Sequence, residues 1–209
     1  MNDLRLFESI PIPAVEERIF KRLGYVKKTA DTADNIISIV KKHIEETKLF
    51  ISPKGCVKRM QFTVSGGDTI IIPSGVSIKS RSIFNFLESS REIIFMGATS
   101  GAEISTAIER DCREENVTRA AVYDACGSEI VDACLDWIIG YIGKEISRER
   151  CFLTRRFSAG YGDFSLSNQK IIYDELEFGK LGVRLTDSFM LVPEKSVLAL
   201  AGIYEEPDI

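Results

Sequence analysis

The longest helical pattern in this chain spans residues 118–149, and it limits which folds are possible. Within it, apolar side chains recur at spacings of four, four, three and one, at Cys126, Ile130, Cys134, Trp137 and Ile138. Such spacing places them on one helix face, which must be buried against another layer of the protein. Gly127 either interrupts this helix or allows it to pack closely. The two cysteines are better explained as apolar core filling than as a metal or redox site.

Shorter helices and strands are expected around this tract. Helical spacing and capping residues predict helices over 13–24, 32–49, 77–90, 102–116 and 167–178. Alternating apolar residues predict a hairpin over 56–72 with its turn at 65–68. Further strands are expected at 92–101, near Val183, and at 197–203 after a second hairpin turn at 193–196. No repeat or linker divides the chain, so we expect one domain over 1–209 with a helical N-terminal part, 1–50.

Composition excludes several classes of protein. The 209 residues are 44% hydrophobic and 28% charged, as in ordinary globular proteins. The net charge of −4, with basic residues spread along the chain, argues against nucleic-acid binding. No apolar run approaches the roughly 18 residues of a membrane span, and the N-terminus lacks a secretory pattern. Five cysteines without a CxxC spacing indicate reduced thiols. We therefore expect a cytoplasmic protein that binds neither membranes nor nucleic acid.

Common catalytic and metal sites are missing from the sequence. His43 is the only histidine, and its position among charged residues predicts a solvated surface side chain. A multi-histidine metal site or a histidine-based triad is therefore not expected. The stretch GATSGAE at 97–103 follows an apolar strand without the G-x-G-x-x-G spacing, so it is better explained as a strand-to-helix connection than as a ligand loop. We expect no catalytic residue and no metal ligand.

The stretch RRFSAGYGDFSLSNQK at 155–170 carries the most distinctive chemistry. Arg156 offers a planar fork of donors for a carboxylate or phosphate. Gly160 allows a ligand to lie against the main chain, and Tyr161 offers a flat ring and a hydroxyl. The set suits a ligand with an anionic end and a flat ring, such as an amino-acid nucleoside. The alternative is an ordinary loop in which Arg156 pairs with a protein acid and Tyr161 packs into the core.

Two motifs in the last quarter of the chain resemble the activation (reactivation) domain of cobalamin-dependent methionine synthase. The first is an R-x-x-x-G-Y signature followed by a helix. The second is a G-[IV]-x-L-T-[ED]-S-x-x-M-x-P-x-x-S-V segment. The matching residues are Arg156, Gly160, Tyr161, Gly182, Leu185, Thr186, Asp187, Ser188, Pro193, Ser196 and Val197. A looser likeness reaches back to about Ile93.

The resemblance implies an α+β fold: a C-shaped domain with a mostly antiparallel central sheet and flanking helices. It also implies S-adenosylmethionine as the bound ligand. Arg156 would hold the ligand's carboxylate, Ser158 and Gly160 would offer backbone contacts, and Tyr161 a side-chain contact. The reaction implied is the reductive methylation of an oxidised cobalamin. An electron donor such as flavodoxin or ferredoxin would supply the electron.

The chain also departs from the family pattern. It contains no D-x-H-x-x-G motif of a cobalamin module, so the cobalamin would be carried by a separate methionine synthase that lacks its own activation domain. An aromatic ligand contact from the family's C-terminal extension has no counterpart, and an acidic contact from near its N-terminus has no clear match. Two alternatives stay open: a scaffold subunit that has lost ligand binding, and a reactivation protein for another corrinoid methyltransferase.

Overall fold

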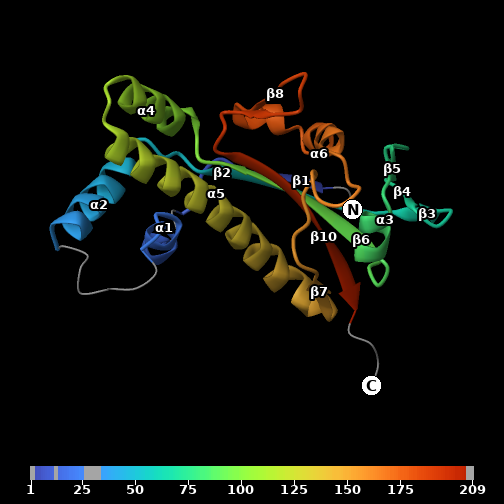
Figure 1. The fold of residues 1–209 in the computed structure, drawn as a ribbon. Helices are drawn as coiled ribbons and strands as arrows, with labels where there is room; N and C mark the ends of the chain where they lie inside the picture. Colours follow the sequence, from blue (N-terminus) through green and yellow to red (C-terminus); the bar gives the residue numbers. More distant parts are fainter. Residues whose placement is uncertain (1–2, 12–13, 26–33, 206–209) are drawn as a thin grey trace.

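A five-stranded antiparallel sheet with the strand order β1-β2-β6-β10-β7 lies at the centre of the computed structural model (Figure 1). The structure describes residues 3–11, 14–25 and 34–205. The strands are β1 Asp3–Phe7, β2 Lys54–Gln61, β3 Thr63–Ser65, β4 Thr69–Ile71, β5 Ser77–Lys79, β6 Glu92–Thr99, β7 Cys151–Leu153, β8 Arg184–Leu185, β9 Leu191–Val192 and β10 Ser196–Glu205. The α-helices are α1 Glu16–Arg22, α2 Asp34–Thr47, α3 Arg81–Phe86, α4 Ala102–Arg113, α5 Val117–Ile146 and α6 Gln169–Glu175.

The middle strands β6 and β10 are buried on both faces because their side chains alternate between two hydrophobic clusters. On the α5 side lie Ile94, Met96, Ala98, Ala199 and Ala201. On the opposite side lie Ile93, Phe95, Leu198 and Leu200. The alanines of β10 leave room for α5 to approach the sheet closely.

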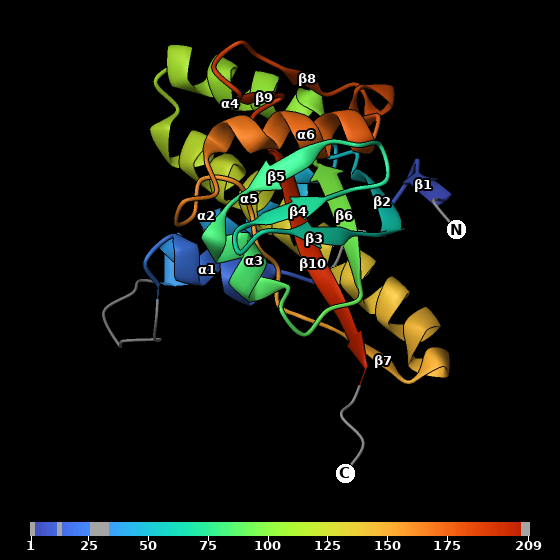
Figure 2. The ribbon, with the colours of Figure 1, turned by 90° about the vertical axis from the view of Figure 1, so that its right-hand side faces the viewer.

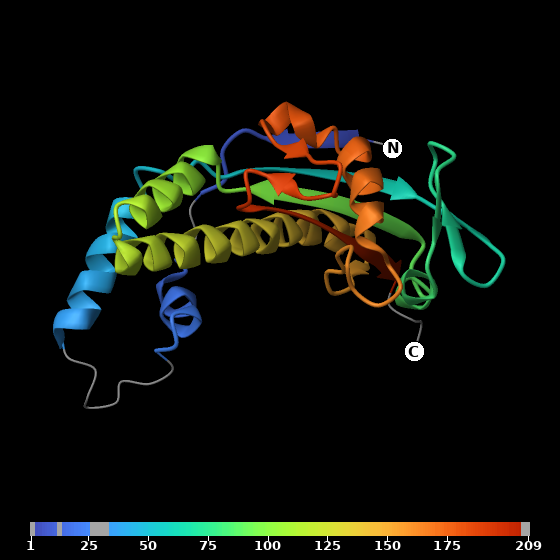
Figure 3. The same ribbon diagram turned by 45° about the horizontal axis from the view of Figure 1, so that its top comes forward.

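Helix α5 forms most of the layer on one face of the sheet. Its 30 residues run without interruption, a length of about 45 Å at roughly 1.5 Å per residue. A Cβ atom at Gly127 would lie 2.9 Å from Cγ of Lys195, so this glycine serves close packing. Figure 3 shows α2 and α4 gathered at one end of α5 and the β3-β4-β5 sheet projecting at the other end of the molecule.

The other face of the central sheet is covered by α3, α6 and two small sheets, β3-β4-β5 and β8-β9 (Figure 2). Fully buried aromatic rings fill this second layer, among them Phe95, Phe164 and Phe178. The expected α+β architecture, a mostly antiparallel sheet with flanking helices, is therefore confirmed. None of the helices that the structure describes combines the length and the apolar character needed to cross a membrane.

Several predicted elements are confirmed with small changes at their ends. These are α2, β6, α4, α5, α6 and β10. The first helix is shorter than expected, at Glu16–Arg22, and its predicted start at Pro13 lies outside the described residues. In the predicted 97–103 connection, Ser100 and Gly101 link β6 directly to α4.

Two expectations for the N-terminal half of the chain are wrong. The 1–50 part is not all helical, because Asp3–Phe7 forms edge strand β1 beside β2. The 56–72 segment is not one hairpin: β2 pairs with β1 and β6, and a separate short hairpin joins β3 to β4. Local alternation identified the strands, but the choice of partner depends on contacts far away in the sequence.

Two further expectations are also corrected. The predicted helix over 77–90 divides into β5 and α3. In α3 and at its C-cap the buried hydrophobic residues are Ile83 and Leu87, with Phe84 only half-buried. The hairpin expected to turn at 193–196 does not form, because β9 pairs with β8 while β10 joins β6 and β7. The ten-residue β10 gains more by lying in the central sheet than by pairing with a two-residue strand.

His43 is not the solvated surface residue that the sequence suggested. Its side chain is 16% exposed, its Nδ1 lies 2.8 Å from Oε2 of Glu46, and its ring meets Tyr123 edge-on. The histidine lies on the buried side of α2, together with Val40 and Ile44, and packs toward α5.

All five cysteines are free thiols. Cys56, Cys126 and Cys134 are buried, and burial raises the pKa of these thiols to about 12, 11 and 12, respectively. The cysteines of α5 therefore pack as apolar core residues, as their spacing predicted.

Candidate functional site

The segment that follows β7 is held against the central sheet at Phe157. Its backbone N–H donates to the carbonyl of Leu200 and its carbonyl accepts from the N–H of Leu200, both at 2.8 Å. The Phe157 side chain packs on the cluster away from α5. Because neighbouring side chains of an extended chain point to opposite sides, Arg156 and Ser158 are directed toward α5.

A cavity of about 320 Å³ lies between this segment, α5 and β10. Its lining residues are Asp132, Leu135, Arg156, Phe157, Ser158, Tyr161, Val197 and Ala199. The charged side chains in this lining are one arginine and one aspartate, and the others are apolar, aromatic or hydroxyl-bearing. Cavities of roughly 300–1,000 Å³ with this mixture are typical of small-molecule sites.

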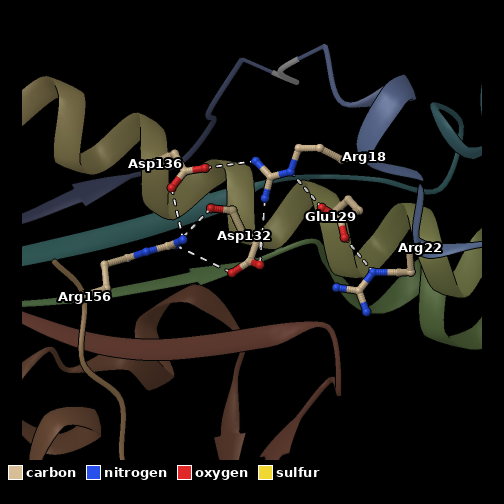
Figure 4. A network of polar contacts seen from close by, with 6 residues as sticks. All are labelled: Arg18, Arg22, Glu129, Asp132, Asp136 and Arg156. Carbon is tan, nitrogen blue, oxygen red and sulfur yellow. Dashed lines mark hydrogen bonds and ion pairs between the residues drawn. The ribbon is translucent and has the colours of Figure 1, made fainter. Parts of the chain in front are cut away.

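Arg156 reaches from the loop to the acidic face of α5 (Figure 4). Its Nη1 donates to the main-chain carbonyl of Asp132 at 3.2 Å and lies 3.6 Å from Oδ1 of the same residue. Its Nη2 lies 3.1 Å from Oδ1 of Asp136. The Arg156 side chain is 27% exposed, and it lines the cavity while it makes these contacts.

Arginines of α1 also contact this acidic face of α5 (Figure 4). Arg18 lies 3.0 Å from Asp136, and Glu129 accepts hydrogen bonds from Arg18 at 2.8 Å and Arg22 at 2.6 Å. Burial by itself raises the pKa of Glu129, but the bonds from the two arginines outweigh it and leave the pKa below its usual value. The site is thus built on an ionised network.

Asp163 and Gly162 anchor the loop that carries Tyr161. The Asp163 carboxylate accepts hydrogen bonds from Oγ of Ser80 at 2.6 Å and from the N–H groups of Arg81 and Ser82 at 2.8 and 3.0 Å. These bonds, that of the Ser80 hydroxyl foremost, hold the pKa of Asp163 well below its usual value. Gly162 has a φ of +58°, and a Cβ there would lie 2.5 Å from Oγ of Ser82.

The other predicted site residues lie close to Arg156, with different access to the cavity. Ser158 and Tyr161 line it, and Tyr161 is 67% exposed. Gly160 does not line it, and its N–H donates to the carbonyl of Phe164 at 2.7 Å, so a ligand contact would have to use its carbonyl oxygen. The alternative expected from the sequence is met only in its first half: Arg156 pairs with protein acids, but Tyr161 does not pack into the core.

This architecture is similar to that of one solved protein of known ligand. A crystal structure of the MetH reactivation domain bound to AdoHcy matches with a TM-score of 0.73 and 13% sequence identity, covering 100% of this chain and 80% of that chain. The chain has the fold of the methionine synthase reactivation domain. No family model matches the sequence, and no curated protein matches it.

Within this reactivation-domain fold, the cavity lining contains four residues that were not predicted as site residues, although Val197 belongs to the second sequence motif. They are Asp132 and Leu135 on α5 and Val197 and Ala199 on β10. Two acids at positions i and i+4 in an apolar tract, Asp132 and Asp136, were the available signal. Both side chains are partly exposed, at 43% and 50%, and their charged partners are arginines.

A second cavity, of about 310 Å³, lies at the far end of the reactivation-domain sheet. Arg5 pairs there with Glu145, and Arg59 pairs with Glu92 and Glu149. These pairs connect β1, β2 and β6 to α5 and the turn after it, which is a structural role. Among residues 3–11, 14–25 and 34–205, no group of three or more His, Cys, Asp or Glu is arranged to hold a metal ion.

Proposed function

We propose that this chain binds S-adenosylmethionine in the cavity beside Arg156 and supports reductive methylation of the oxidised cobalamin of a separate methionine synthase. One observation carries the proposal. An arginine and an aspartate meet at one cavity, in a fold shared with a solved protein that is bound to AdoHcy. AdoHcy is the ligand of that protein, and the proposal that this chain binds a related ligand is based on the chemistry of the cavity.

The lining fits the amino-acid end and the ring of such a ligand. The Arg156 guanidinium suits a carboxylate, and the Asp132 carboxylate suits the ammonium group next to it. The exposed ring of Tyr161 offers a flat face for adenine or for the positive sulfonium. The amino acid and the nucleoside are thereby matched by different parts of one cavity.

Ligand binding requires Arg156 to exchange one carboxylate for another. A guanidinium has five N–H donors, and the contacts to Asp132 and Asp136 come from Nη1 and Nη2. The side chain of Asp136 is 50% exposed, so its pairing with Arg156 is a partly hydrated contact of low net energy. A ligand carboxylate that binds bidentately can displace it.

The residues of this chain then act by holding and orienting the methyl donor, which is a proximity effect. After reduction by an electron donor such as flavodoxin or ferredoxin, the partner's cobalt would supply the nucleophile that takes the methyl group, and S-adenosylhomocysteine would be left. No acid or base from this chain is needed for that transfer. The proposed partner is a methionine synthase that lacks its own activation domain, which would place the reaction in the cytoplasm.

Calorimetric titration with S-adenosylmethionine tests the proposal. Arg156→Ala should weaken binding by about 2 kcal/mol, roughly thirty-fold, the low end for a charged contact because the guanidinium is partly hydrated. Arg155→Ala is the matched control, since Arg155 is an adjacent exposed arginine outside the cavity lining. The proposal is wrong if the native protein gives no binding heat, and the role of Arg156 is wrong if both variants bind like the native protein.

A scaffold function is the second candidate, and the bonds between Arg156 and the two aspartates favour it. Those bonds satisfy the arginine without any ligand. A scaffold would bind methionine synthase but give no heat with S-adenosylmethionine. The same calorimeter, loaded with methionine synthase as titrant, separates the two candidates.

A further inference from the structure

Asp132 and Asp136 are each shared between two arginines from distant parts of the chain (Figure 4). In Asp136, Oδ2 lies 3.0 Å from Nη1 of Arg18 and Oδ1 lies 3.1 Å from Nη2 of Arg156. In Asp132, Oδ2 lies 3.9 Å from Arg18 and Oδ1 lies 3.6 Å from Arg156. Each carboxylate therefore presents one oxygen to the α1 arginine and the other to the site arginine.

The network is balanced in charge only when Arg18 is counted. Glu129, Asp132 and Asp136 carry three negative charges, and Arg18, Arg22 and Arg156 carry three positive charges. Arg22 contacts Glu129 alone among these acids. Without Arg18, the two aspartates would have Arg156 as the arginine that neutralises them.

We infer that Arg18 is the specificity-determining residue that makes the site prefer ligands with a carboxylate. It does so without touching the ligand, since it does not line the cavity. Because Arg18 already holds one oxygen of each aspartate, a ligand carboxylate can take Arg156 while Asp136 keeps a cationic partner. This inference rests on the proposed function and deepens it.

The sign of the effect follows from elementary electrostatics. Removing a positive charge next to Arg156 disfavours any ligand carboxylate placed there, relative to the same ligand without that carboxylate. The side chains of Arg18, Asp132 and Asp136 are between 40% and 50% exposed, so water screens their charges and reduces the effect. We expect a change of about five-fold in the preference, which corresponds to about 1 kcal/mol.

The test measures one ratio in the full-length chain by calorimetry. The ratio compares the Kd of decarboxylated S-adenosylhomocysteine with the Kd of S-adenosylhomocysteine. Both are thioethers, and loss of the carboxylate changes the net charge from zero to +1 at neutral pH, so the ratio reports how strongly the site prefers the carboxylate. Arg18→Gln should lower this preference for the carboxylate about five-fold. Arg22→Gln should change it less than about two-fold, because it removes the same charge and one contact with Glu129 but no contact with the aspartates.

Arg18→Lys tests whether the charge of Arg18 or its packing determines the preference. It also provides a second variant in case Arg18→Gln folds poorly. A lysine keeps the positive charge beside the aspartates, so the preference should stay within about two-fold of the native value. The thermal unfolding midpoints of all variants report whether α1 stays docked. The readout is a preference between two ligands, which a general loss of folding would not change.

The outcomes are distinguishable from failure of the proposed function. If the native protein binds neither ligand, the proposed function is wrong and this inference falls with it. If the native protein binds and prefers S-adenosylhomocysteine, but Arg18→Gln keeps that preference, Arg18 has only a structural role. Equal losses in Arg18→Gln and Arg22→Gln would likewise overturn the inference.

Discussion

Asp136→Asn provides a sharp test of how Arg156 is used, because the two acids next to this arginine should have opposite effects on binding. Asp136 holds Nη2 of Arg156 at 3.1 Å but does not line the cavity, whereas Asp132 lines it. If the ligand's carboxylate must replace Asp136, then removing the charge of Asp136 removes a competitor. Asp136→Asn should therefore tighten binding of S-adenosylhomocysteine.

The size of the effect follows from the exposure of the pair. The Asp136 side chain is 50% exposed, so its interaction with Arg156 is worth about 0.2–1 kcal/mol. Removing that competition lowers Kd by roughly 1.5- to 5-fold. Asp132→Asn should instead weaken binding about five-fold, because it removes a charged contact of about 1 kcal/mol from a cavity wall that is also partly hydrated.

Titration calorimetry of the native protein and the two variants measures both signs in one series. The two substitutions are matched, since each replaces a carboxylate by an amide on the same helix, one turn apart. If Asp136→Asn weakens binding as much as Asp132→Asn does, Asp136 positions Arg156 for the ligand and does not compete with it. That result would refute the exchange of carboxylates on which the proposed binding mode depends.

Three further predictions concern stability and reactivity. The pKa of Asp163 is lowered on folding, so the ionised carboxylate stabilises the fold above the unfolded pKa of about 3.9, and this stabilisation is lost as pH falls below that value. In Asp163→Asn, the free energy of unfolding, measured with urea between pH 3 and 7, should therefore fall less steeply at the acid end than in the native protein. In α5, Gly140→Ala should stabilise the protein by up to about 1 kcal/mol, since nothing lies within 4 Å of the added Cβ. Gly127→Ala should be at least about 1 kcal/mol less stable than Gly140→Ala, because its added Cβ displaces the stem of Lys195. The urea midpoints of the two variants measure this difference. A thiol reagent should modify exposed Cys112 quickly and the three buried cysteines only at the rate of unfolding, and fast labelling of more than two thiols would contradict their burial.

Local patterns predicted the elements whose formation depends on neighbouring residues. The 30-residue α5 has a buried face that repeats with helical period, and the structure shows it at 117–146. Strand β6 was expected from its apolar run, and its burial on both faces follows from the central place it takes in the sheet. Here composition and periodicity were sufficient because burial of one face determines the local conformation.

Strand partners were beyond the reach of those patterns. Strand β1 begins at residue 3 and pairs with β2, about fifty residues later in the chain, with Asp3 opposite Arg59. The hairpin expected across PEKS did not form, and the one expected across SGGD formed only between the short strands β3 and β4. A turn marks a change of direction but does not say which longer strand lies alongside. Pairing energy comes from contacts between distant segments, and a local pattern carries no information about them.

The chemistry of the candidate site divides in the same way. The sequence by itself determined that Arg156, Gly160 and Tyr161 would lie near one another, since they are within six residues of the chain. Only the tertiary structure decided what faces Arg156. Asp132 lies 24 residues away in the chain, and Arg18 and Asp136 are 118 residues apart. The physical reason is that Coulomb attraction depends on distance in space, and the sheet brings α5, α1 and the loop after β7 to one place.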